Sequence, residues 1–305
     1  MNAGDRRRVA PLAMEFFDLP RPTAGDETVA LCLGPLEIEL TGLDAELARL
    51  LYERYVPYST RRAERDDALR LRLGLDTRDY FIDPPETAEL VRVYLACDGA
   101  RVRYLSYRVA GWFSTNGGEG RVLLGRGDRE PPERALENLL RAAVAWQAAS
   151  RGGALVHAAS AVWKERGYLF YGESGAGKST LSACNRRARV VSDDLSLLLP
   201  GHDGALELVG SPFRGTYTAG PPVVGRFPLA AGFRLIQAER AAVKPVARAR
   251  AMSELVGNLP FVAEAFGTRA DLFERVVAAF SAIPLSHLHF RKDDSYWDAI
   301  ESAGL

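Results

Sequence analysis

The sequence has little of what marks exported, membrane-embedded or disulfide-bonded proteins. It contains only three cysteines, Cys32, Cys97 and Cys184, and their odd number and wide spacing predict neither a disulfide framework nor a Cys-x-x-Cys metal site. No stretch approaches the roughly 20 apolar residues that a membrane-spanning helix requires. Residues 1–22 include three adjacent arginines, but no apolar segment follows them, so no secretory signal is predicted. We therefore expect a cytoplasmic protein with no membrane partner.

An excess of charge is also absent. The chain carries 39 basic and 39 acidic residues, so no global basic field favours nucleic acid, and we expect no nucleic-acid partner. Apolar residues make up 47% and charged residues 26%, as in an ordinary globular protein. A length of 305 residues is long for one domain, which favours two.

A polar segment rich in Gly and Pro at 126–133 is typical of a linker and predicts the break between two domains, 1–126 and 127–305. Before it, one helix is expected at 43–54, with Asp44 and Glu46 in its first turn. Alternation of apolar and polar residues otherwise predicts strands at 28–33, 35–41, 69–73, 90–95, 101–109 and 121–124. The N-terminal domain is therefore expected to be a smaller, β-rich α+β domain.

After the break, helices and strands alternate, which predicts an α/β domain. Helices are expected at 132–149, 179–187, 251–258 and 269–281. Strands are expected at 154–162, 167–171, 189–192, 195–199, 206–209, 233–237 and 285–290.

The strand at 167–171 leads into a segment that matches the P-loop pattern Gly-x-x-x-x-Gly-Lys-Ser/Thr without deviation. Its residues are Gly172, Glu173, Ser174, Gly175, Ala176, Gly177, Lys178 and Ser179, followed by Thr180. Glycines let successive backbone N–H groups turn inward to hold phosphate, and the following helix adds the positive end of its dipole. We expect Lys178 to reach the β- and γ-phosphates of a nucleotide and Ser179 to ligate Mg²⁺. A glycine-rich turn with a solvated lysine is the alternative.

The strand at 189–192 ends in two neighbouring acids, Asp193 and Asp194. A P-loop commonly needs an acid at the end of a neighbouring strand as a second anchor for the metal. One carboxylate of this pair is expected to hold Mg²⁺ and the other to act as general base, without the pattern deciding which. The alternative is a turn or a helix cap, a usual place for exposed aspartates.

His157 lies within an otherwise apolar strand that precedes the P-loop strand. A histidine there is more often a satisfied core residue than a catalyst, although its pKa near neutral pH suits proton transfer.

The order of Val156-His157-Ala158, the P-loop and Ser192-Asp193-Asp194 resembles the catalytic domain of HPr kinase/phosphorylase and its HPr-kinase-like relatives. It is similar also to the core of ATP-dependent phosphoenolpyruvate carboxykinase, and the segment 210–215 resembles the related kinases. The resemblance implies a P-loop kinase domain with a mixed sheet, ATP and Mg²⁺ as cofactors, and phosphorylation of a serine hydroxyl. It also implies a base or acid role for the Asp pair, assisted by His157.

A kinase that phosphorylates a serine of a protein or peptide, as peptide-tailoring kinases do, is therefore the leading hypothesis. Arg214 is the candidate second cation for the transferring phosphoryl group, and a solvated or salt-bridged loop arginine is its alternative. A nucleotide-dependent ATPase or GTPase switch and a carboxykinase-like small-molecule phosphotransferase remain open, as does the choice between ATP and GTP.

The N-terminal domain is expected to recognise the acceptor or to mediate assembly, which leaves a homo-oligomer open. Within it, residues 102–108 are a candidate edge strand that accepts an extended peptide, and an ordinary strand with solvated arginines is the alternative.

Overall fold

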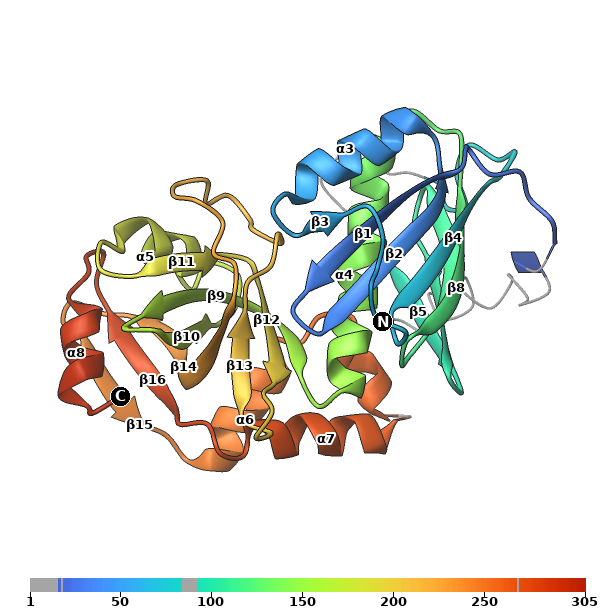
Figure 1. Ribbon diagram of the computed structural model, residues 1–305. Coiled ribbons are helices and arrows are strands. Elements are labelled where there is room, and N and C mark those ends of the chain that lie inside the picture. Colours follow the sequence, from blue (N-terminus) through green and yellow to red (C-terminus); the bar gives the residue numbers. More distant parts are fainter. Residues whose placement is uncertain (1–15, 18, 84–92, 268) are drawn as a thin grey trace. The chain divides into compact units, whose positions relative to one another are not determined.

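The computed structural model describes residues 16–17, 19–83, 93–267 and 269–305. The chain forms two compact units, Met1–Gln147 and Ala148–Leu305, each built around a β-sheet (Figure 1). Both sheets contain parallel and antiparallel strands, so the expected α/β class with mixed sheets is confirmed. Within the described ranges, no helix is both long and apolar enough to span a bilayer.

The first unit is an eight-stranded sheet in the order β3-β1-β2-β4-β8-β7-β6-β5. Strands β2, β4 and β8 are parallel neighbours and the other pairs are antiparallel. The strands are β1 (Glu27–Leu33), β2 (Leu36–Leu43), β3 (Ser59–Thr60), β4 (Leu69–Leu75), β5 (Tyr94–Asp98), β6 (Arg101–Leu105), β7 (Val109–Ser114) and β8 (Gly118–Leu124).

Two helices accompany this sheet, α3 (Ala45–Tyr55) and α4 (Pro132–Ser150). Helix α3 begins where the Asp44 side chain accepts a hydrogen bond from the Leu47 N–H at 2.8 Å, so Asp44 caps the helix rather than lying inside its first turn. Helix α4 is anchored to the first unit by Gln147, whose side-chain oxygen accepts from the Gly117 N–H at 2.7 Å. The two compact units divide in the last turn of α4, whereas the linker composition predicts the boundary at 126/127, before α4 begins.

The second unit is also an eight-stranded sheet, in the order β10-β9-β12-β13-β14-β16-β15, with β11 beside β9. An additional pairing of β10 with β14 closes a five-stranded barrel from β10, β9, β12, β13 and β14. The strands are β9 (Ala154–Trp163), β10 (Arg166–Tyr171), β11 (Arg189–Ser192), β12 (Leu195–Pro200), β13 (Leu206–Val209), β14 (Arg226–Gln237), β15 (Ala242–Pro245) and β16 (Leu285–Phe290).

Three strands of this unit, β10, β14 and β16, are parallel neighbours. Their carboxyl ends therefore meet at one edge, the usual ligand-binding edge of such sheets. The helical elements of the unit are α5 (Lys178–Cys184), α6 (Arg248–Val256), the 3₁₀ turn η1 (Ala263–Gly267), α7 (Ala270–Phe280) and α8 (Tyr296–Ser302).

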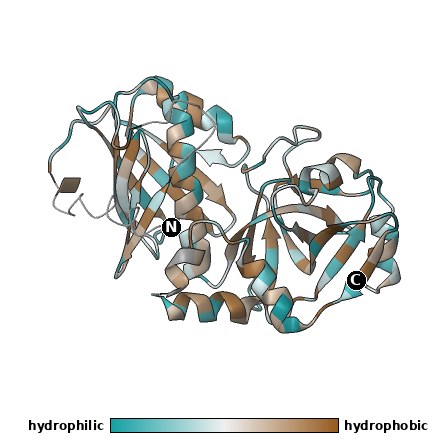
Figure 2. Ribbon diagram, turned by 180° about the vertical axis from the view of Figure 1, so that it is seen from behind, coloured by the Kyte–Doolittle hydropathy of each residue, from teal (hydrophilic) through white to brown (hydrophobic). Residues whose placement is uncertain are grey.

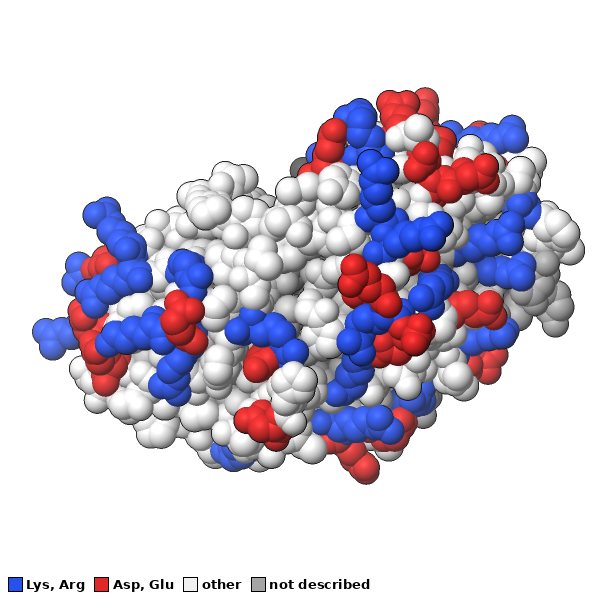
Figure 3. All heavy atoms as spheres, in the orientation of Figure 1, with Lys and Arg blue, Asp and Glu red and all other residues white. Residues whose placement is uncertain are grey.

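An aromatic cluster fixes α8 against the strands. The Trp297 ring packs edge-on against Tyr168 and Phe170, with centroids 5.2 and 5.9 Å away, and Phe170 stacks on Phe233 at 5.8 Å. Hydrophobic residues recur along the strands of both sheets (Figure 2), as expected where sheet faces pack against a core. Charges of both signs are interspersed on the face drawn in Figure 3, in keeping with the balanced composition.

Most expected elements are present, and both expectations for segment 101–109 of the first unit are wrong. The segment 101–109 is not one strand, because it turns at 106–108 to form the β6–β7 hairpin. It is not an edge either, because β6 pairs with β5 on one side and β7 on the other. Of the strand expected at 90–95, residues 90–92 lie outside the described residues, and β5 begins at Tyr94.

Candidate functional site

The loop after β10 turns at three glycines with positive φ, namely Gly172 (155°), Gly175 (81°) and Gly177 (106°). L-residues with a side chain rarely adopt such angles. Gly177 has a second constraint, because a Cβ there would lie 2.5 Å from the Phe290 ring. The glycines of the pattern are therefore required by backbone conformation and, at Gly177, by close packing.

Lys178 begins α5 and folds back under the loop. Its Nζ donates hydrogen bonds to the carbonyl oxygens of Gly172 at 2.8 Å and Glu173 at 3.3 Å, and the residue is only 7% exposed. Burial lowers the pKa of Lys178, and the nearby Asp194 carboxylate opposes that shift. A lysine held in this way lies where a phosphate bound to the loop would need a compact cation.

One cavity of about 390 Å³ gathers the predicted P-loop, the acidic pair and the histidine, a size within the range of small-molecule sites. It is lined by His157, Ser174, Gly175, Gly177, Lys178, Ser179, Thr180, Asp193, Asp194, Gly215, Thr216, Gln237 and Lys292. The structure therefore brings together residues of β9, the P-loop and the β11–β12 turn.

The topology explains why the acidic pair and His157 meet. Strands β11 and β12 both pair with β9, and the turn between them is Asp193-Asp194. The Ser192 hydroxyl closes this turn by accepting from the N–H groups of Asp194 and Leu195, each at 3.1 Å. Leu195 then pairs directly with His157 on β9, which brings Asp194 beside the histidine.

Asp193 is 3% exposed, and the loop after β13 occupies its carboxylate. Its Oδ1 accepts from the Gly215 N–H at 2.8 Å. Its Oδ2 accepts from the N–H groups of Thr216 and Tyr217, each at 3.1 Å, and lies 3.2 Å from the Thr216 hydroxyl. Asp193 therefore positions the 215–217 loop at the wall of the cavity.

Asp194 faces the cavity differently. Its side chain is 30% exposed, and its Oδ1 lies 3.5 Å from Nε2 of His157, which is 44% exposed. Burial and the charge of Lys178 lower the pKa of His157, although Asp194 acts in the opposite direction. A carboxylate next to a neutral imidazole is an arrangement suited to accepting a proton.

The remaining predicted residues divide between the cavity and its surroundings. Ser179 and Thr180 line it, whereas Glu173 points away, with an 87% exposed side chain 3.4 Å from Arg234. Gly172 and Ala176 do not line the cavity among the described residues and act through the loop backbone.

Arg214 is tied to the backbone rather than to the cavity. Its guanidinium donates to the carbonyl oxygens of Val191, Gly220 and Pro221, at 3.3, 3.2 and 2.7 Å. The predicted second cation is thus engaged in holding its own loop.

Two residues that line the cavity, Gln237 and Lys292, were not predicted from the sequence. Both follow or end parallel strands whose carboxyl ends adjoin the P-loop, and Gln237 donates from Nε2 to the Gly175 carbonyl at 3.0 Å. The ends of the strands expected at 233–237 and 285–290 could have marked them, had the pairing of β10 with β14 and of β14 with β16 been known.

No group of three or more His, Cys, Asp or Glu side chains that could hold a metal occurs among the described residues. A magnesium ion in a P-loop does not require such a group, because it takes few protein oxygens and completes its shell with phosphate and water. Ser179 and Asp194, both on the cavity wall, provide hard oxygen donors of the right kind. The residues present therefore fit a nucleotide-bound Mg²⁺.

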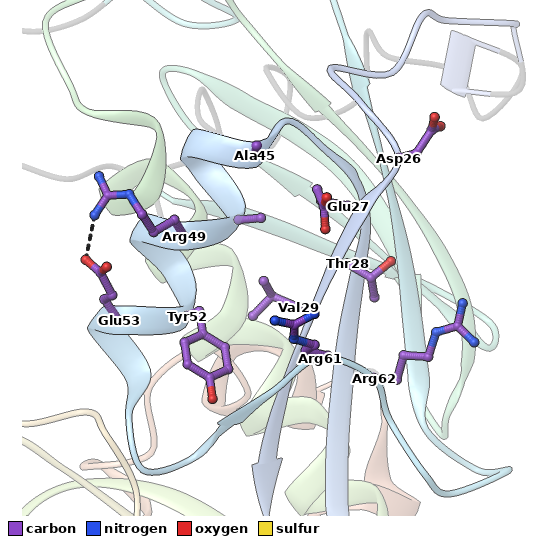
Figure 4. Close-up of a pocket in the computed structure, with 11 residues that line it drawn as sticks. Asp26, Glu27, Thr28, Val29, Ala45, Arg49, Tyr52, Glu53, Arg61 and Arg62 are labelled. Carbon is purple, nitrogen blue, oxygen red and sulfur yellow. Dashed lines mark hydrogen bonds and ion pairs between the residues drawn. The ribbon is translucent and has the colours of Figure 1, made fainter.

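The first unit has a cavity of its own, of about 680 Å³, between α3 and β1 (Figure 4). Its charges are mixed, and two of them, Arg49 and Glu53, are joined in a 2.7 Å ion pair along α3. The described residues that line it include no phosphate loop and no carboxylate–imidazole pair, so the chemistry of a P-loop is not supported there.

No family model matches the chain, and no curated protein matches it.

Proposed function

We propose that this protein is an ATP- and Mg²⁺-dependent kinase of the P-loop class that transfers the γ-phosphoryl group to a serine hydroxyl of a protein or peptide. The observation that carries the proposal is the meeting of Asp194 and His157 with the phosphate loop in one cavity. Phosphate-binding loops also occur in nucleotide-dependent switches and pumps. A carboxylate next to an imidazole, as in Asp194 and His157, is in addition suited to removing the proton of an acceptor hydroxyl.

Each residue has a role in this proposal. The backbone of the glycine loop and Lys178 would hold the phosphates, and Ser179 would hold Mg²⁺, with Asp194 reaching the ion only through water. Mg²⁺ supplies neutralisation of the charge on the phosphoryl oxygens. Asp194, next to His157, accepts the serine proton as the hydroxyl oxygen bonds to the γ-phosphorus and the bond to the β–γ bridging oxygen breaks, with ADP as leaving group. Asp193 keeps the 215–217 loop in place beside them.

The proposal is consistent with the expected kinase fold, in which a histidine strand, a P-loop strand and a strand ending in two acids lie side by side. Here β9 pairs with β10 and with both β11 and β12. Transfer in such sites depends mainly on positioning and charge neutralisation, which these backbone-fixed residues provide.

The test is whether ATP turnover depends on an acceptor. Purified protein with Mg²⁺ and ATP is mixed with a library of serine-containing peptides, and ADP release is measured against the same library with alanine in place of serine. We expect slow hydrolysis alone and faster ADP release only with some serine peptides, both lost in Lys178→Met. Fast hydrolysis that no peptide changes would favour a nucleotide-hydrolysing switch and overturn the kinase.

A further inference from the structure

Lysine is rare in this chain, and its few positions are informative. The sequence has 35 arginines but only four lysines, and two of the four, Lys178 and Lys292, line the phosphate cavity. No arginine of the described residues lines it. Of the other two, Lys164 pairs with Glu301 at 2.6 Å, and Lys244 lies on the β15 strand. Because lysine is a compact and strongly hydrated point charge, it suits a single phosphate oxygen better than a bidentate partner.

Lys292 is brought to the cavity by the strand that precedes it. Strand β16 ends at Phe290, whose ring lies against Gly177 of the P-loop. Since β16 runs parallel to β14 and β14 to β10, all three carboxyl ends meet at the edge that carries the phosphate loop. Lys292, two residues beyond Phe290, therefore extends from the same edge as the loop.

The turn that carries Lys292 is fixed, and the two acids that follow Lys292 are engaged with other residues. Asp293 accepts from the backbone N–H and the hydroxyl of Ser295 and forms an ion pair with Arg291. Asp294 lies 3.3 Å from the Arg187 guanidinium. These contacts hold the backbone of the turn and neutralise both neighbouring carboxylates.

Lys292 itself is exposed, and it makes no ion pair or side-chain hydrogen bond within the described part of the chain. Holding an exposed lysine in one position on the surface adds little to the stability of a protein. On the wall of a phosphate cavity, the same group is a cation available to the ligand, in contrast to Arg214, whose guanidinium is bonded to three carbonyl oxygens.

We infer that Lys292 is the second cation of the site and contacts the γ-phosphoryl group of the bound nucleotide. The inference rests on the proposed function, since it assumes a nucleoside triphosphate in the cavity. Lys178 begins α5 in the P-loop, while Lys292 comes from the turn between β16 and α8, and both line the cavity. Two lysines from separate segments of the chain would together neutralise the terminal phosphate as charge redistributes toward the leaving group.

The test compares ATP with ADP, which differ only in the group that Lys292 is inferred to contact. The affinities of Lys292→Met and of the wild-type protein for Mg²⁺-ATP and for Mg²⁺-ADP are measured by calorimetry. The matched control is Lys244→Met, which removes the same charge from the same unit but lines neither the phosphate cavity nor its loop.

We expect Lys292→Met to weaken ATP binding, or to slow ATP turnover, by about tenfold or more while ADP affinity stays within about twofold. Lys292→Arg should recover part of the loss, because it keeps the charge but changes its geometry. Unchanged ATP affinity and turnover would overturn the inference, and so would an equal loss for ATP and ADP. Because these readouts need no acceptor, failure of serine transfer alone would remove the kinase but not the role of Lys292, whereas wild-type protein that binds no nucleotide would remove both.

Discussion

At the scale of single residues, two neighbouring aspartates have different surroundings. Asp193 is buried and accepts from three backbone N–H groups, so its charge holds the 215–217 loop. Asp194 is partly exposed and lies beside His157 and Lys178. The geometry thus assigns a structural role to Asp193, and in the proposed kinase Asp194 is the residue that contacts the substrate.

This division predicts different results for two otherwise identical substitutions. Asp194→Asn should lower phosphoryl transfer by roughly 10²–10⁴-fold, the range for loss of a general base, with little change in melting temperature. Asp193→Asn should destabilise the fold by about 1–3 kcal/mol, because its amide N–H groups would face the loop donors that Asp193 now accepts from. Thermal denaturation and steady-state turnover of both variants check this. Equal losses of stability would contradict the assigned roles.

A second residue-scale prediction concerns the packing of the P-loop against β16. Gly177→Ala should destabilise the protein by about 1–3 kcal/mol, because its Cβ would lie 2.5 Å from the Phe290 ring. Gly175→Ala is the matched control, since Gly175 also has positive φ but open space around it. The double variant Gly177→Ala/Phe290→Leu should lose less unfolding free energy than the sum of the losses in the two single variants. Equal unfolding free energies for Gly177→Ala and Gly175→Ala would show that the contact is unimportant.

At the scale of elements, a cluster of charges joins helix α6 to two strands. Glu254 on α6 accepts from Arg234 on β14 at 2.6 Å and from Arg250 on its own helix at 2.9 Å, and it lies 2.8 Å from the His287 ring on β16. Burial alone would raise the pKa of Glu254, but these hydrogen bonds outweigh it and lower the pKa to about 2. Arg234 also contacts Glu173, so the cluster extends to the P-loop.

The lowered pKa predicts how stability depends on pH. A carboxyl that is harder to protonate when folded stabilises the protein above its unfolded value, and the contribution is lost as pH falls from about 4.5 toward 2. Glu254→Gln should therefore lower the unfolding free energy at pH 7 by about 1–3 kcal/mol. The difference in unfolding free energy between this variant and the wild-type protein should become smaller as the pH falls. Denaturant unfolding at several pH values measures this. Glu301→Gln, which removes the exposed ion pair with Lys164, is the control and should change the unfolding free energy little. A difference between Glu254→Gln and wild type that stays constant with pH would contradict the role assigned to Glu254.

The elements also show what sequence patterns can and cannot predict. Short segments rich in apolar residues predicted strands such as β11 and β16 at their observed ends. The sequence pattern extended β6 through the turn to Val109 and missed the rest of β7, because the turn at 106–108 contains no Gly, Pro, Asn or Asp. It also placed β14 at 233–237, whereas the strand begins at Arg226, since its first residues pair with β13 rather than following a simple alternation.

At the scale of the whole molecule, the candidate site combines local and distant residues. Its local part, from His157 to Asp194, could be predicted because motif and spacing occur within one stretch of chain. Gln237 and Lys292 could not, because they reach the cavity only through the parallel pairing of β10, β14 and β16. The two units divide between Gln147, whose side chain accepts from the Gly117 N–H, and Ala148, and the composition of segment 126–133 carries no information on that contact.

The central claim is that the P-loop cavity transfers phosphate to a serine. The most direct measurement is mass-spectrometric mapping of phosphorylation sites on serine-containing peptides after incubation with Mg²⁺ and γ-¹⁸O-labelled ATP, for wild-type protein and Asp194→Asn. We predict labelled phosphoserine on at least one peptide with the wild-type protein and a loss of at least about 10²-fold with the variant. Labelled inorganic phosphate alone, with no phosphoserine on any peptide, or equal labelling by both proteins, would contradict this account.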